Sequence, residues 1–141
     1  MRALVLYSSV GNLTALAKAL AEGLEAENIR ADLMQVDPSR TQPISVAAYD
    51  LVCVGSPSLG LVRGRIADDV AEALTRCTRL EGKRTAAFVR RSGFGWAKAL
   101  KQLMAALEKQ GAWVEDFAEL GGDEEARAFG RRLKNVAKAR A

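Results

Sequence analysis

The sequence predicts an α/β fold in which an open parallel sheet is covered by helices on both faces. Five apolar segments of strand length alternate with amphipathic segments of helical length along the chain. The first, third and fourth apolar segments are nearly continuous runs, which is typical of parallel strands buried on both faces. The expected strands are residues 3–7, 31–36, 51–55, 85–89 and 113–118.

The intervening helices are indicated by apolar residues that recur every three or four positions. Gly23, Gly82 and Gly111 fall where helices should end or strands should begin. Residues 37–50 contain two prolines, and we expect at most a short helix there. The four apolar stripes are Leu13, Leu16, Ala17, Leu20 and Leu24; Ile66, Val70, Ala71 and Leu74; Leu100, Leu103, Met104 and Leu107; and Ala126, Phe129, Leu133 and Val136.

Length and composition suit one soluble globular domain, residues 1–141, with 49% hydrophobic and 27% charged residues. No apolar run approaches the roughly 20 residues of a membrane span. The first residues enter a strand directly, without the basic and apolar leader of a signal peptide. We therefore expect a cytoplasmic protein with no membrane contact.

The chain contains no histidine, which excludes histidine-based acid–base chemistry and most transition-metal sites. Cys53 and Cys77 have no metal-binding or CxxC spacing, so we expect no metal. No catalytic residue can be assigned. If the protein is an enzyme, a cofactor carries its reactive chemistry.

Charge is unevenly distributed along the chain. Residues 1–61 hold 4 Lys and Arg against 6 Asp and Glu, whereas residues 62–141 hold 17 against 11. A basic half can bind nucleic acid or an anionic ligand. Here the basic residues are interspersed with acids along helical faces, which is typical of solvated surface, so we expect no nucleic-acid partner.

The turn after the first strand, Ser8 to Thr14, is a candidate phosphate site. A strand followed by a turn rich in hydroxyls and then a helix aims free backbone N–H groups at one point. The turn has no Lys or Arg, so a phosphate would be held by amides and by the hydroxyls of Ser8, Ser9 and Thr14. The alternative is an ordinary helix start with Ser9 or Asn12 as the cap.

Two further loops belong to the same edge, because ligands of such sheets bind outside the carboxyl ends of the strands. The loop at 55–64 contains Pro57, which makes it rigid. The loop at 90–96 offers two glycines for close backbone approach, and Phe94 and Trp96 as flat surfaces for a planar ligand. The alternative is that each aromatic is a packing residue.

Taken together, the three loops resemble those of the flavodoxin-like family. The resemblance rests on Tyr7-Ser8-Ser9, on Gly55-Ser56-Pro57-Ser58 and on Gly82-Lys83-Arg84, and it extends over nearly the whole chain. The first loop is most similar to the tyrosine-serine-x-x-glycine loop of the quinone-reductase branch, and the length is similar to that of short-chain flavodoxins. The resemblance implies a three-layer flavodoxin-like fold with strand order 2-1-3-4-5 and helices on both faces.

The resemblance also implies flavin mononucleotide (FMN) as the cofactor. Its phosphate would be enclosed by the first loop, and its isoalloxazine ring would lie between the other two. The implied residues are Ser8, Ser9, Val10, Gly11, Asn12, Leu13 and Thr14 around the phosphate, Ser56, Pro57, Ser58, Leu59 and Gly60 on one side of the ring, and Arg91, Ser92, Gly93, Phe94 and Gly95 on the other.

The sequence departs from the family pattern in three ways. Hydroxyls common in flavodoxins are missing at Val10 and Leu13, and the stacking aromatic is missing at Leu59 and Leu61. The third departure is a basic environment where electron-carrying flavodoxins are acidic, formed by Arg63, Arg65, Arg90 and Arg91.

These arginines would stabilise the anionic reduced flavin and raise its two-electron potential above that of typical flavodoxins. The alternative is that they point to solvent or pair with Asp68 and Asp69.

Three functions remain open at this point. An FMN-binding electron-transfer protein is favoured, since no residue identifies a second substrate; its partner would be a redox protein or a small-molecule acceptor. The second is an FMN-dependent oxidoreductase of the NAD(P)H or quinone type. The third is a flavodoxin-like domain that has lost FMN and serves as a binding or regulatory module.

Overall fold

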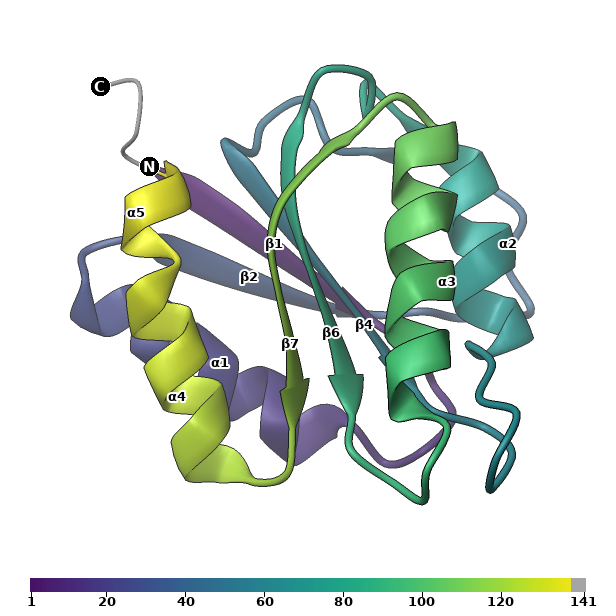
Figure 1. Ribbon diagram of the computed structural model, residues 1–141. Helices are drawn as coiled ribbons and strands as arrows, with labels where there is room; N and C mark the ends of the chain where they lie inside the picture. Colours follow the sequence, from purple (N-terminus) through teal and green to yellow (C-terminus); the bar gives the residue numbers. More distant parts are fainter. Residues whose placement is uncertain (138–141) are drawn as a thin grey trace.

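The centre of the molecule is a five-stranded parallel sheet (Figure 1). This computed structural model describes residues 1–137, so the last four residues of the predicted domain lie outside the described residues. The strands lie in the order β2-β1-β4-β6-β7, which is 2-1-3-4-5 for the five predicted strands and confirms the predicted order. They are β1 (Arg2–Tyr7), β2 (Arg30–Gln35), β4 (Leu51–Pro57), β6 (Arg84–Arg90) and β7 (Trp113–Leu120).

The burial of each strand follows its place in the sheet. The inner strands β1, β4 and β6 are almost wholly buried, and every residue of β4 is buried. The edge strands β2 and β7 leave large apolar side chains exposed, including Leu33, Met34 and Phe117. Only inner strands have two covered faces, which explains why the first, third and fourth segments are continuous apolar runs.

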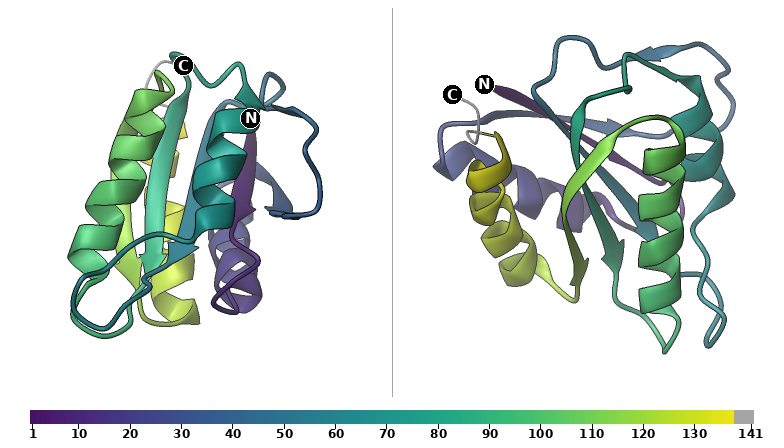
Figure 2. Two further views of the ribbon diagram at one scale, coloured as in Figure 1. Left: turned by 90° about the vertical axis from the view of Figure 1, so that its right-hand side faces the viewer. Right: turned by 45° about the horizontal axis from the view of Figure 1, so that its top comes forward.

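Helices cover both faces of the sheet (Figures 1 and 2). One face packs against α1 (Thr14–Ala26), α4 (Asp123–Arg132) and α5 (Lys134–Ala137), and the other against α2 (Asp68–Arg76) and α3 (Trp96–Lys109). Successive side chains of each strand enter opposite cores: Phe88 of β6 lies on the α1 side, while Ala87 and Val89 lie on the α3 side.

Residues 37–50 do not form the short helix that their sequence would have allowed. They contain instead the two-residue strand β3 (Ile44–Ser45), which pairs in parallel with β5 (Cys77–Thr78) after α2. Two-residue strands carry too little periodicity to be recognised in a sequence.

Gly23 does not end the first helix, as its sequence position suggested, but lies inside α1. A Cβ atom at Gly23 would lie 2.2 Å from the carbonyl oxygen of Arg127, and one at Gly130 would lie 2.3 Å from that of Leu20. These glycines therefore allow the backbones of α1 and α4 to touch. Gly82 and Gly111 do precede β6 and β7, as predicted.

No helix within residues 1–137 is both long enough and apolar enough to cross a membrane. In the same part of the chain, no three metal-ligating side chains gather into a group that could hold an ion.

We predict that Gly23→Ala lowers the free energy of unfolding by roughly 1–3 kcal/mol, because the added methyl group pushes α1 away from α4. Alanine is intrinsically the better helix former by about 1 kcal/mol, so propensity alone predicts the opposite sign. Urea unfolding measures the difference. The control is Gly122→Ala, where a Cβ meets nothing within 4 Å and the backbone is extended. Equal stability of the two variants would contradict the close helix contact.

Candidate functional site

Three loops meet at the carboxyl edge of the sheet, the lower edge in Figure 1. The first loop (residues 8–13) follows β1, the second loop (residues 58–67) follows β4, and the third loop (residues 91–95) follows β6. The strand order reverses between β1 and β4, which makes this the topological switch point of the sheet.

The first loop turns through two residues with positive φ, Gly11 at 86° and Asn12 at 55°. The N-cap of α1 is Leu13, with no side-chain cap, so neither Ser9 nor Asn12 caps the helix. Within residues 1–137, the N–H groups of Gly11, Asn12 and Leu13 have no hydrogen-bond partner. These three consecutive donors lie at the positive end of the α1 dipole, where an anion is favoured.

The side chain of Asp69, from the first turn of α2, reaches across to the first loop. Ser8 Oγ donates to Asp69 Oδ1 at 2.6 Å, and Ser9 donates to Asp69 Oδ2 through its N–H at 2.8 Å and its Oγ at 2.7 Å. The Ser8 hydroxyl also accepts from the N–H of Val10 at 3.0 Å. A carboxylate therefore already occupies part of the predicted anion site.

Asp69 is ionised at neutral pH. Partial burial raises the pKa of its carboxyl group, but the hydrogen bonds from Ser8 and Ser9 outweigh this effect, and the pKa lies below its ordinary value. From the sequence, Asp69 was expected only as a possible partner of the arginines. Its contact with Ser9 joins residues 60 positions apart, for which the sequence holds no local signal.

The remaining side chains of the first loop and the start of α1 differ in exposure. Leu13 is 1% exposed and belongs to the core, so only its backbone can face a ligand. Val10 is 45% exposed. Thr14 is the first residue of α1 and half-buried, and its hydroxyl makes no hydrogen bond to the described residues.

Two of the residues expected beside the ring belong to β4, because this strand runs two residues further than predicted, to Pro57. The Ser56 hydroxyl donates to the Pro57 carbonyl at 2.8 Å and accepts from the N–H of Ala67 at 3.0 Å. It therefore links β4 to the start of α2 inside the protein. Pro57 packs on the first loop, so closely that a Cβ on Gly11 would lie 2.5 Å from its own Cβ.

The second loop is closed by backbone pairing. Leu59 and Arg65 exchange two N–H to carbonyl hydrogen bonds, at 2.8 and 2.9 Å, and Gly60 turns between them with a positive φ. Ser58 lies just before this pair. Its Oγ is buried and has no partner in the part of the chain that the structure describes, which is a cost unless a ligand or water supplies one.

The second and third loops touch through their backbones. The N–H of Phe94 donates to the carbonyl of Leu61 at 2.8 Å. Gly64 and Gly95 lie in direct contact, since a Cβ on Gly64 would be 1.7 Å from the Gly95 carbonyl oxygen. Gly93, with a φ of 62°, lies against Leu61 in the same way. The structure thus brings the second and third loops together, through Leu61 and Gly64 on one side and Gly93, Phe94 and Gly95 on the other.

The two aromatic residues of the third-loop region differ. The Phe94 ring is 82% exposed and available to a partner. Trp96 is half-buried and packs on the α2–α3 side of the core, so the packing interpretation holds for it. Ser92 is exposed.

Arg91 leaves the site. Its guanidinium lies across Gly121 and pairs with Glu119 at 3.4 Å and Glu125 at 3.2 Å, on the side of β7 and α4. Arg65 pairs with Asp68 at 3.7 Å, as one alternative expected, while Asp69 pairs with serines and not with an arginine.

Arg90, which the implied ligand set omitted, joins β6 to the first loop. Its Nη1 donates to the carbonyl of Asn12 at 2.8 Å and to that of Gly11 at 3.3 Å. The basic charge of Arg90 was apparent from the sequence, but the position of these acceptors was not.

Neither cysteine supplies a thiolate for chemistry. Burial raises the pKa of Cys53, inside β4, to about 12 and that of Cys77 to about 11. Both thiols therefore stay protonated at neutral pH.

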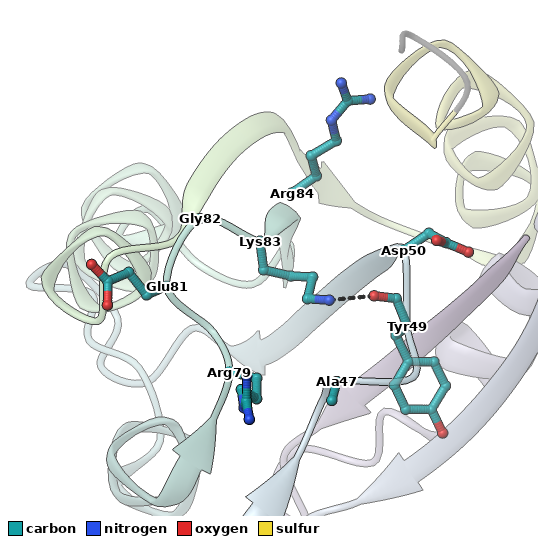
Figure 3. Close-up of a pocket in the computed structure, with 8 residues that line it drawn as sticks. All are labelled: Ala47, Tyr49, Asp50, Arg79, Glu81, Gly82, Lys83 and Arg84. Atoms are coloured by element: carbon teal, nitrogen blue, oxygen red, sulfur yellow. Dashed lines mark hydrogen bonds between the residues drawn. The ribbon is translucent and has the colours of Figure 1, made fainter. Parts of the chain in front are cut away.

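A hollow of about 730 Å³ lies at the opposite, amino edge of the sheet (Figure 3). Its charged groups have mixed sign, and two of the cations are held by neighbours: Lys83 donates to the Tyr49 carbonyl, and Arg84 turns away to donate to the carbonyl of Val136. These contacts are structural. The free N–H groups of Gly11, Asn12 and Leu13 lie at the three loops and not at this hollow.

We predict that Gly64→Ala destabilises the protein by roughly 1–3 kcal/mol more than Gly60→Ala, because only the first substitution forces two loops apart. Both positions have a positive φ, so the backbone strain of alanine is shared, but the nearest atom to a Cβ at Gly60 is 3.7 Å away. Thermal unfolding of the two variants measures the difference. Equal losses would mean that the second and third loops do not touch in solution.

Comparison with known proteins agrees with this fold. The flavodoxin family model matches residues 4–130. Three solved structures share the fold. Oxidised Flavodoxin 1 from Bacillus cereus has a TM-score of 0.71 and 20% identity, and the match covers 100% of this chain and 99% of that chain. The flavodoxin, WrbA-like protein from Agrobacterium tumefaciens has a TM-score of 0.70 and 22% identity, with 99% of each chain covered, and a flavone reductase has a TM-score of 0.73 and 10% identity, with 98% of this chain and 63% of that chain covered. No curated protein sequence gives a significant match. The family match over most of its length shows that the chain belongs to the flavodoxin family.

Proposed function

We propose that this chain binds FMN at the three loops and acts in electron transfer. Flavodoxins are FMN-binding proteins, and in this fold the cofactor lies at the switch point of the sheet. The observation that carries the proposal is the row of free N–H groups at Gly11, Asn12 and Leu13, at the positive end of α1.

The donor set suits a phosphate. Backbone amides at a helix start bind phosphate without Lys or Arg, and the hydroxyls of Ser8 and Ser9 lie beside them. In the second loop, the Ser58 hydroxyl is buried without a partner among the described residues, and a polar edge of the ring would supply one. When bound, the isoalloxazine ring supplies the redox chemistry by taking up and releasing electrons.

Exposed apolar side chains surround the same edge and support a protein as the redox partner. Val10, Leu61, Val62 and Phe94 are 45%, 68%, 61% and 82% exposed. Such a group of large apolar side chains on a surface favours docking. The arginines of the second loop beside them would favour a partner with an acidic patch.

An FMN-dependent oxidoreductase using NAD(P)H or a quinone is the second candidate. It is favoured by Arg63, which is exposed in the second loop and makes no ion pair within residues 1–137, so that it can receive a phosphate of the nicotinamide cofactor. Steady oxidation of NAD(P)H by the FMN-loaded protein alone would favour this function over electron transfer.

We predict that the purified, dialysed protein quenches FMN fluorescence with one site per chain. It should bind riboflavin at least about tenfold more weakly, because riboflavin lacks the phosphate and a tenfold ratio needs only about 1.4 kcal/mol. Titration of both ligands under identical conditions gives the ratio. Absence of quenching by FMN would exclude both redox functions and leave a flavin-free binding or regulatory module.

We predict that the two-electron potential of the bound flavin lies above that of typical flavodoxins and that Arg90→Gln lowers it. Arg65 and Arg91 are neutralised by acids. Arg63 and Arg90 form no ion pair within residues 1–137, and of these two Arg90 is the one that donates to the first loop. Its removal should lower the potential by about 30 mV, which is about 1.4 kcal/mol for a two-electron couple. Arg30→Gln, at the amino end of β2, removes the same charge at the far edge and serves as the control. An equal shift in both variants would contradict a local effect of Arg90.

A further inference from the structure

The Asp69 carboxylate is bound in the way that the first loop would bind a phosphate. Both of its oxygens are engaged, one by the Ser8 hydroxyl and the other by the N–H and hydroxyl of Ser9. All three bonds are 2.6–2.8 Å long, as is typical of charge-assisted hydrogen bonds to an anion. No Lys or Arg of the described residues forms an ion pair with it, so hydrogen-bond donors balance its charge.

We propose that Asp69 is an internal competitor for the phosphate site: its carboxylate occupies donors that a bound phosphate needs and thereby weakens phosphate binding by the first loop. This inference rests on the proposed function, since it names the group that regulates the affinity of the same site.

The competition follows from the geometry. The N–H groups of Gly11, Asn12 and Leu13 are free, but the neighbouring donors of Ser8 and Ser9 are used. A phosphate that took up all of them would have to displace the carboxylate. A phosphate that used the free amides alone would lie beside a second negative charge, which repels it.

The contact also has a structural benefit in the free chain. Ser8 is fully buried, and its hydroxyl would lack an acceptor without Asp69. Removal of the carboxylate should therefore lower the stability of the free protein and raise its affinity for phosphate. A purely structural role of Asp69 predicts the loss of stability but no gain in phosphate affinity, so measuring both quantities tests the proposal.

The test compares the wild type with Asp69→Asn and Asp68→Asn, using inorganic phosphate as the probe. Asp68 precedes Asp69, its side chain is 99% exposed, and its substitution changes the net charge equally. We expect Asp69→Asn to bind phosphate at least about tenfold more tightly, as followed through the amide NMR shifts of residues 9–13, and Asp68→Asn to change less than about twofold. Without phosphate, Asp69→Asn should have the lower melting temperature, and phosphate should raise it more than in the wild type.

Unchanged phosphate affinity in Asp69→Asn, or an equal gain in Asp68→Asn, would overturn the proposal. A second measurement needs no variant: in the wild type, saturating phosphate should shift the ¹³C resonance of the Asp69 carboxyl group as it leaves the serines, and an unchanged resonance would count against displacement.

FMN separates this inference from the proposed function. If phosphate binding improves in Asp69→Asn but no variant binds FMN, the competition holds and the flavin function fails. If the wild type and Asp69→Asn bind FMN and phosphate equally well, the flavin function holds and the competition fails.

Discussion

The parallel pairing of β4 with β1 on one side and β6 on the other is the constraint on which the site depends. In this register Tyr7 lies opposite Gly55, and Pro57 opposite Arg90, so the three strands end at one edge. Gly55 contributes to this arrangement because Phe88 lies across it; a Cβ there would be 2.1 Å from the ring. Once these ends are fixed, Pro57 packs on the first loop and Arg90 reaches its carbonyls. The loops meet because the strands end together.

The same constraint creates an unusual balance of polar groups. Strand β1 delivers a fully buried hydroxyl, Ser8, to a point where the start of α1 already leaves backbone donors unsatisfied. Buried polar groups need partners, and Asp69 supplies one from the adjacent α2. The loop is thus partly satisfied from within the chain. In the proposed site, an external anion would therefore bind at the expense of an internal one.

The features that the sequence predicted are those set by local patterns. Burial on two faces makes the inner strands continuously apolar, which was enough to predict the fold class and, with the family resemblance, the strand order. The role of Gly23 was predicted wrongly, because a sequence does not distinguish a glycine that ends a helix from one that lets two helices touch. Phe94 and Trp96 lie two residues apart but differ in exposure, because only Trp96 packs on the core on the α2–α3 side. Asp69 was missed because its partners are 60 and 61 residues away.

Arg90 explains why the first loop presents two of its free amides in one direction. In a trans peptide the carbonyl and the following N–H point to opposite sides. The Arg90 guanidinium holds the carbonyls of Gly11 and Asn12, so the N–H groups of Asn12 and Leu13 point away from it. Aligned amides of this kind form an anion-binding concavity. Arg90 and Asp69 therefore have opposite effects on anion binding. Arg90 orients backbone donors toward an anion, whereas Asp69 occupies neighbouring donors. If the loop binds phosphate as proposed, its affinity is set by the difference between these two contributions.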